Sequence, residues 1–114
     1  MSSYQPDNLL LSGEYQTEEG FAAANQTLVL GQVVEKDVNG DFVAVTTADK
    51  AYGIVADPIV TDTNKAPTVV YVHGAFQRRR IVLPKDAKVE DFVTPLRNKG
   101  IYLKHTETDG VVNV

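Results

Sequence analysis

The chain has 114 residues, of which 43% are hydrophobic, and it contains no cysteine. This length predicts a single domain with a packed core that no disulfide or thiolate-bound metal reinforces. The net charge of −4 disfavours nucleic acid as a partner, because proteins that bind a duplex usually carry a basic excess. No signal-peptide pattern and no apolar run long enough to cross a membrane is present, so we expect the protein to stay where it is made.

Residues 1–20 are rich in polar side chains, follow no regular period and predict a flexible arm. The only apolar run in them consists of Leu9, Leu10 and Leu11, with Tyr4 and Tyr15 at a distance on either side. The arm is either a frayed terminus or a segment that becomes ordered on a partner. The leucines favour a partner, because leucines left in water stabilise nothing. We therefore expect deletion of residues 2–14 to leave the stability of the fold nearly unchanged.

Short β-type segments follow from residue 25 onward, separated by turn residues. They cover residues 28–34, 42–46, 51–56, 68–72 and 75–83. Asn39-Gly40 lies between the first two and predicts a tight hairpin, while Pro58 and Pro84 close later segments. Regularly spaced short strands with Gly and Pro between them are typical of a small barrel or sandwich.

One interval, residues 86–99, has a helical pattern instead. Its apolar residues share one helical face: Val89, Phe92, Val93 and Leu96. Thr94-Pro95 fits a cap followed by proline at the first helical position, so we expect two short helical turns rather than one helix. Gly100 fits the helix stop, residues 101–104 a final strand and residues 106–114 a loose tail.

The chain shows no pattern that predicts catalysis. His73 and His105 have no acidic or histidine neighbour at metal-ligand spacing, and no nucleophile elbow, phosphate loop or dinucleotide fingerprint is present. Residues 52–57 faintly resemble a segment of trimeric dUTP pyrophosphatases, but Ala56 stands where that motif has aspartate, and the tyrosine that should follow is missing. We expect no enzyme activity, no cofactor, no metal and no small-molecule substrate.

Three consecutive arginines, Arg78, Arg79 and Arg80, form the sharpest charge feature. On a strand, Arg78 and Arg80 would share one face and Arg79 would lie on the other. The triplet fits an exposed edge strand protected by charge. It also fits an electrostatic contact with an acidic partner surface, whereas nucleic acid is the least favoured partner.

Several stretches of the chain, in this order and spacing, resemble the lambda-type head decoration proteins of tailed bacteriophages. The clearest are Ala51-Tyr52-Gly53-Ile54-Val55-Ala56 and, after a polar loop, Ala66-Pro67-Thr68-Val69-Val70-Tyr71-Val72-His73-Gly74-Ala75-Phe76. Further matches are residues 25–34, Pro84 after an aliphatic run, and Gly100-Ile101-Tyr102-Leu103. The resemblance covers residues 21–104. One departure is Leu83, because relatives often have tryptophan before the proline that closes the long strand.

The resemblance implies a mainly β, bent-ribbon (β-clip-like) small barrel with one or two short helices. Residues 21–114 would form this domain, and residues 1–20 a flexible capsid-binding arm. The implied function is a homotrimer that decorates the outside of the expanded head, at threefold and quasi-threefold positions, and cements it against internal DNA pressure.

The implied partner is the major capsid protein, and no nucleic acid, membrane or small-molecule substrate is expected. The implied location is the outer surface of the virion, after synthesis of the protein in the host cytoplasm. The expected capsid-binding residues are Tyr4, Pro6, Leu9, Leu10, Leu11 and Tyr15. Arg78 and Arg80 are secondary candidates for capsid or trimer contacts. The main alternative is a β-rich module of another virion part, such as a tail or fibre component, and an inactive relative of a trimeric enzyme is a more distant one.

Overall fold

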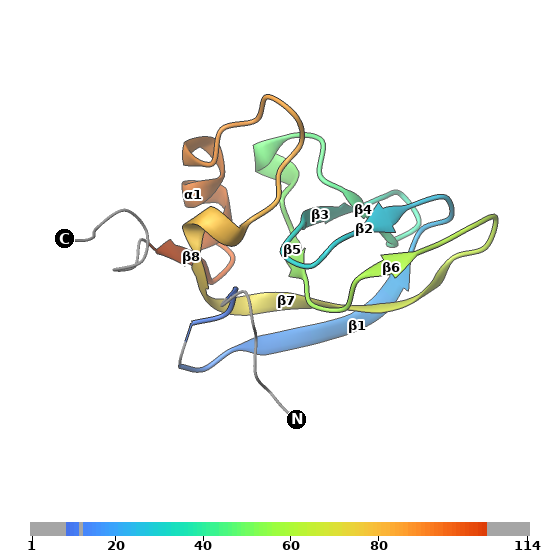
Figure 1. The fold of residues 1–114 in the computed structure, drawn as a ribbon, viewed down its shortest axis with the longest axis horizontal. Helices are drawn as coiled ribbons and strands as arrows, with labels where there is room; N and C mark the ends of the chain where they lie inside the picture. The colour runs from blue at the N-terminus through green and yellow to red at the C-terminus, as the bar shows by residue number, and fades with distance from the viewer. Residues whose placement is uncertain (1–8, 12, 105–114) are drawn as a thin grey trace.

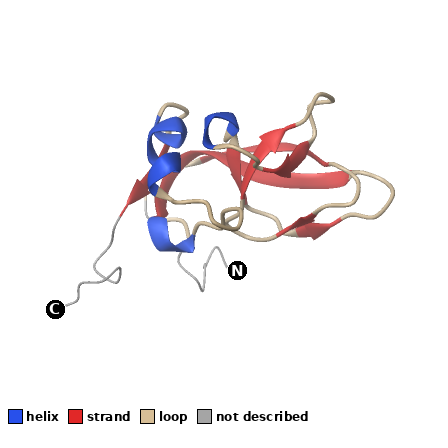
Figure 2. Ribbon diagram, turned by 90° about the horizontal axis from the view of Figure 1, so that it is seen from above, coloured by secondary structure: helices blue, strands red, loops and turns tan. Residues whose placement is uncertain are grey.

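The computed structural model describes residues 9–11 and 13–104, which are mainly β (Figure 1). The strands are β1 (Gln16–Ala22), β2 (Thr27–Leu28), β3 (Val33–Lys36), β4 (Phe42–Ala44), β5 (Gly53–Val55), β6 (Ile59–Val60), β7 (Ala66–Gln77) and β8 (Ile101–Lys104). The helical elements of the described residues are α1 (Glu90–Arg97) and two 3₁₀ turns, η1 (Ala48–Lys50) and η2 (Arg78–Arg80). They gather towards one end of the molecule, while strands extend to the other (Figure 2). The predicted fold class, a mainly β small barrel with one or two short helices, is confirmed.

Five strands close into a small barrel in the order β1-β4-β3-β5-β7, because β7 pairs back with β1. β7 is the longest strand and pairs with β1, β5 and β8, so it connects the barrel to the helical end (Figure 1). The seam between β1 and β4 is much shorter, since one residue pair, Ala22 opposite Phe42, joins these parallel strands. Closure at this seam therefore needs contacts other than the strand ladder.

Adjacent residues on the barrel strands point into two different hydrophobic clusters. One cluster receives Val33, Ile54 and Tyr71, and the other receives their neighbours Val34, Val55 and Val70. The helix α1 packs against the first cluster with Phe92 and Leu96. Because the side chains of a strand alternate between its two faces, these strands have no polar face at these positions. Their sequences therefore appear as nearly continuous apolar runs rather than as alternating patterns.

The hairpin predicted around Asn39-Gly40 is confirmed between β3 and β4. Asp37 organises the turn, because its Oδ1 accepts hydrogen bonds from the backbone N–H groups of Asn39, at 2.9 Å, and Asp41, at 3.0 Å. Gly40 alone of the dipeptide has a positive φ, +84°, the conformation in which glycine is favoured.

The prediction of two separate helical turns in residues 86–99 is wrong. Residues Glu90–Arg97 form one α-helix with Pro95 inside it. Proline removes a single donor near the end of this eight-residue helix, whereas Phe92 and Leu96 are buried on its inner face, so packing outweighs the lost hydrogen bond. Gly100, with φ of +91°, follows the helix as expected, and β8 comes directly after it.

Two predicted strands differ from the structure in more than the position of their ends. The segment 28–34 is interrupted by a turn at Gly31, where φ is +88° and the backbone packs against the carbonyl of Arg80. The segment 75–83 is not a separate strand, because β7 continues through Gly74 to Gln77 and the three arginines then form η2. The prediction that Arg78 and Arg80 share one face of a strand is therefore wrong. A 3₁₀ turn has three residues per turn and spreads the three side chains around its axis.

Candidate functional site

Residues 9–11 continue the antiparallel pairing along β7 beyond the point where β1 begins. Two hydrogen bonds place Leu10 opposite Phe76 in an antiparallel bridge: the Leu11 N–H donates to the Ala75 carbonyl at 2.9 Å, and the Gln77 N–H donates to the Leu9 carbonyl at 2.9 Å. Between this segment and β1 lies Gly13, with φ of +121°. Residues 9–11 and β1 are therefore two parts of one interrupted edge along β7.

Leu9 lies in the core of the molecule, fully buried in the cluster that also contains Val33, Ile54 and Phe76. Leu10 and Leu11 are half-buried. The prediction that these leucines have nothing to bury against within the chain is therefore wrong for Leu9 and also for Leu10, which packs against the same cluster. The division between arm and domain, placed after residue 20, also differs from the structure, because β1 begins at Gln16 and pairs with β7 along its length.

Tyr15 lies immediately before β1 and is half exposed. Its ring packs edge-on against the ring of Tyr71, with 5.7 Å between centroids, and Tyr71 in turn lies 5.1 Å from Phe76. An exposed aromatic ring held in place by a buried one is suited to contact with another protein. Of the other predicted capsid-binding residues, Tyr4 and Pro6 lie outside the described residues.

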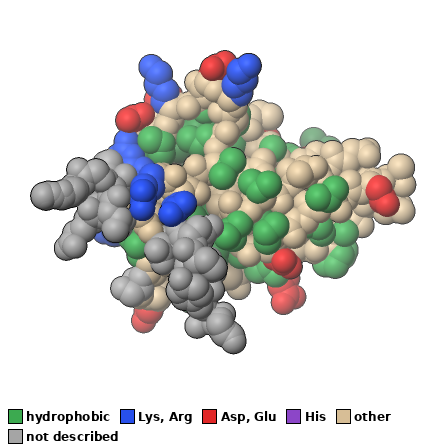
Figure 3. Space-filling model, in the orientation of Figure 1, with side chains coloured by type: hydrophobic (Ala, Val, Ile, Leu, Met, Phe, Trp, Pro, Cys, Tyr) green, Lys and Arg blue, Asp and Glu red, His purple; other side chains and the backbone are tan. Residues whose placement is uncertain are grey.

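The arginine turn η2 follows directly after β7, at the end of the strand where residues 9–11 are paired with it. Nη2 of Arg78 contacts Oε2 of Glu90 at 3.0 Å, which links the turn to the start of α1. Arg79 and Arg80 are exposed, and exposed Lys104 lies next to the turn, because β8 pairs Lys104 with Gln77. On the face shown in Figure 3, Lys and Arg side chains gather at this end of the molecule.

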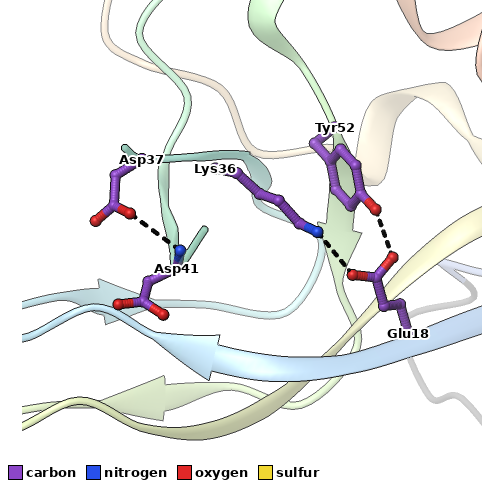
Figure 4. A network of polar contacts seen from close by, with 5 residues as sticks. All are labelled: Glu18, Lys36, Asp37, Asp41 and Tyr52. Carbon is purple, nitrogen blue, oxygen red and sulfur yellow. Dashed lines mark hydrogen bonds and ion pairs between the residues drawn. The ribbon is translucent and has the colours of Figure 1, made fainter. Parts of the chain in front are cut away.

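A polar network lies on the barrel beside the short β1–β4 seam (Figure 4). Nζ of Lys36 donates to Oε2 of Glu18 at 2.9 Å, and the hydroxyl of Tyr52 donates to Oε1 of the same carboxylate at 2.5 Å. The Lys36 ammonium also lies 4.4 Å from the centroid of the Tyr52 ring. The network joins β1 to the end of β3 and to the residue before β5, and so adds contacts between strands that the ladder does not pair.

These contacts shift the protonation equilibria of all three groups. The Tyr52 hydroxyl and then the Lys36 ammonium lower the pKa of Glu18 below its ordinary 4.5. The Glu18 carboxylate raises the pKa of Lys36 and, together with burial, that of Tyr52. All three shifts favour the charge states present near neutral pH, so the network is intact there and is lost at the acidic and alkaline extremes.

Sequence reasoning missed this network and the position of Lys104. The members of the network are 18 and 34 positions apart along the chain, and no local period connects them. Lys104 reaches η2 through strand pairing with β7, and the exact pairing of distant strands is not visible in a single sequence.

The described part of the chain contains no cluster of three or more His, Asp or Glu side chains arranged to hold a metal ion. Its helices include none of the length and apolarity needed to span a bilayer. Three features lie near one end of β7. They are residues 9–11, which are hydrogen-bonded to the strand, the partly exposed ring of Tyr15, and the guanidinium groups of η2.

Comparison with known families shows what the chain is similar to. The family model described as Bacteriophage lambda head decoration protein D matches residues 1–100 of the chain. The matched region includes the barrel, η2 and α1 and ends just before β8. No curated protein sequence matches the chain significantly.

Proposed function

Because the chain belongs to the family of bacteriophage lambda head decoration protein D, we propose that it is a capsid decoration protein, a structural component of the virion and not an enzyme. Trimers of the chain bind the outer surface of the expanded head at threefold and quasi-threefold positions. There they bridge subunits of the major capsid protein and stabilise the head against the pressure of packaged DNA. The observation that carries this proposal is the family match, which covers residues 1–100.

The capsid contacts in this proposal come from the N-terminal segment, with Tyr4, Pro6, Leu10, Leu11 and Tyr15 as contact residues. The half-exposed ring of Tyr15 and the partly exposed side chain of Leu11 support this assignment, whereas Leu10 offers a partner only the part of its side chain that does not pack against the core. Leu9 has a different part, because its buried side chain anchors the segment to the barrel beside Phe76.

The proposed binding mode is strand addition, in which an extended segment pairs with the coat through main-chain hydrogen bonds and places alternate side chains in pockets. A leucine buried from full exposure contributes roughly 1.5–3 kcal/mol before ordering costs, and Leu10 and Leu11 contribute less because they are already half-buried. Ordering costs about 1–2 kcal/mol per backbone residue, so one segment binds weakly. Three segments on a trimer act together, and this avidity can raise the affinity about 10²–10⁴-fold.

The alternative virion part, a tail or fibre component, is separated from this proposal by a binding experiment. Purified protein is mixed with expanded heads that lack it, with unexpanded heads and with isolated tails, and each mixture is sedimented. We expect saturable co-sedimentation with expanded heads alone, and a higher temperature of DNA release from decorated than from undecorated full heads. Binding to tails and not to heads would overturn the proposal.

A further inference from the structure

Charge is unevenly distributed along this chain. Residues 78–104 hold eight of the eleven Lys and Arg residues but three of the fifteen Asp and Glu residues, which gives them a net charge of +5. Residues 1–77 hold three Lys and ten Asp or Glu residues, a net charge of −7. Because residues 78–104 lie together at the end that contains η2, α1 and β8, the molecule has a basic end and an acidic barrel (Figure 1).

The most concentrated positive charge at this end is the basic patch, which we define as Arg79, Arg80 and Lys104 around η2. All three side chains are exposed. Arg79 donates through Nε to Gln77 Oε1, at 3.4 Å, and so to an uncharged group. Within residues 9–11 and 13–104, none of the three forms an ion pair, whereas the neighbouring Arg78 pairs with Glu90. The positive charge of the patch is therefore not neutralised by an ion pair within the described residues.

The carboxylates of the barrel are poor partners for the patch of a second copy, because most of them are already used within the chain. Six of the nine described Asp and Glu residues before residue 78 accept hydrogen bonds or pair with a lysine: Glu18, Glu35, Asp37, Asp41, Asp49 and Asp62. A nucleic acid is also disfavoured, since the barrel would repel its phosphates. An acidic surface on a different protein fits best, and guanidinium groups bind carboxylates in a planar, bidentate manner.

We propose that the basic patch docks on a carboxylate-bearing surface of the coat subunit, next to the site where the N-terminal segment binds. This inference rests on the proposed function and names the chemistry of a second contact. The two contacts are adjacent, because Gln77, the residue before η2, donates its N–H to the Leu9 carbonyl. A charged contact beside the contact made by the N-terminal segment orients the approach and fixes the position of the trimer on the head.

The test compares charge-reversed variants in co-sedimentation with expanded heads that lack the protein. The double variant Arg79→Glu/Arg80→Glu reverses the charge at two of the three positions of the patch. The double variant Arg79→Lys/Arg80→Lys keeps the positive charge but loses the bidentate geometry of the guanidinium groups. The matched control, Lys50→Glu/Lys65→Glu, changes the net charge equally at two exposed lysines outside residues 78–104. Thermal melting of each variant shows whether it is folded.

We expect the Arg-to-Glu variant to melt like the wild type and to bind heads about tenfold more weakly or worse at low salt, since charge pairs across an interface contribute on this scale. The difference should shrink as salt screens the contact. The Arg-to-Lys variant should bind with intermediate affinity, and the control like the wild type.

Three outcomes would overturn the inference while leaving the proposed function in place. The first is equal binding by the Arg-to-Glu variant and the wild type. The second is a loss of trimers in sedimentation velocity, which would make the patch an interface between copies. The third is binding of a short DNA duplex that the same variant loses. Failure of the wild type itself to bind heads would instead overturn the proposed function, and this inference with it.

Discussion

At the scale of single residues, the Glu18 carboxylate links β1 to Lys36 at the end of β3 and to Tyr52 before β5, beside the short β1–β4 seam. This carboxylate accepts hydrogen bonds from Lys36 and Tyr52. These bonds matter because β1 and β4 share one residue pair in the described part of the chain. Both side chains of the ion pair are about one third exposed, so solvent screening keeps its contribution modest.

We predict that Glu18→Gln lowers the stability at pH 7 by about 1 kcal/mol and the melting temperature by about 4–8 °C. The pKa of Glu18 is lowered in the folded state, so its contribution is complete above the ordinary value of 4.5 and is lost as the pH falls through the lowered pKa. The difference between variant and wild type should therefore disappear in strong acid. Denaturation at several pH values measures it, with Glu19→Gln, an exposed neighbour on β1, as the control. A difference that stays constant with pH would contradict the assignment.

Leu9→Ala should destabilise the fold by about 2–5 kcal/mol, because it leaves a cavity beside Phe76 and Val33. Leu11→Ala, at a half-buried position of the same segment, should cost much less and keep the N–H bond to Ala75. Chemical denaturation of both variants checks this. Equal and small effects would show that Leu9 does not anchor the segment.

At the scale of elements, the link between α1 and β8 depends on the left-handed conformation of Gly100. A Cβ at this position would lie 2.6 Å from Nδ1 of His73, whereas one at Gly40, which has a similar positive φ, would meet nothing within 4 Å. We predict a cost of about 1–2 kcal/mol for Gly40→Ala from backbone strain. Gly100→Ala should cost about 2–5 kcal/mol, because crowding adds to the strain. Denaturation midpoints that rank the two variants in the opposite order would contradict this account.

The N-terminal segment should separate into a part that stabilises the fold and a part that binds the head. Deletion of residues 2–8 keeps Leu9 and should leave the melting temperature nearly unchanged while greatly weakening head binding. Deletion of residues 2–14 also removes Leu9, and it should lower the melting temperature, contrary to the expectation from sequence alone. Melting curves and co-sedimentation of both deletions test this. The shorter deletion removes Tyr4 and Pro6, so binding as tight as that of the full chain would place the affinity in Leu10, Leu11 and Tyr15 or in the basic patch.

The elements that could be predicted from the sequence are those that local chemistry determines. Asp37 and Gly40 specify their own turn, and the apolar runs of β5 and β7 follow from burial on both faces. The burial of Leu9 and the turn at η2 could not be predicted, because each depends on partners far away in the sequence. The same holds for the candidate site. Tyr15 and the arginines stand out as residues, but their arrangement around the end of β7 depends on strand pairing.

At the scale of the whole molecule, the basic end and residues 9–11 share one end of β7, and the acidic barrel extends away from it (Figure 1). A molecule with this charge distribution meets a negatively charged surface in a preferred orientation. In the proposed decoration role, the basic end faces the coat and the barrel faces solvent.

Electron microscopy of expanded heads, with and without added protein, tests the decoration role most directly. We predict additional threefold-symmetric density on the outer surface of the heads at the threefold and quasi-threefold positions, present with the full chain and absent without it. Heads that show no added density at saturating protein, or density confined to the tail, would contradict the proposed function.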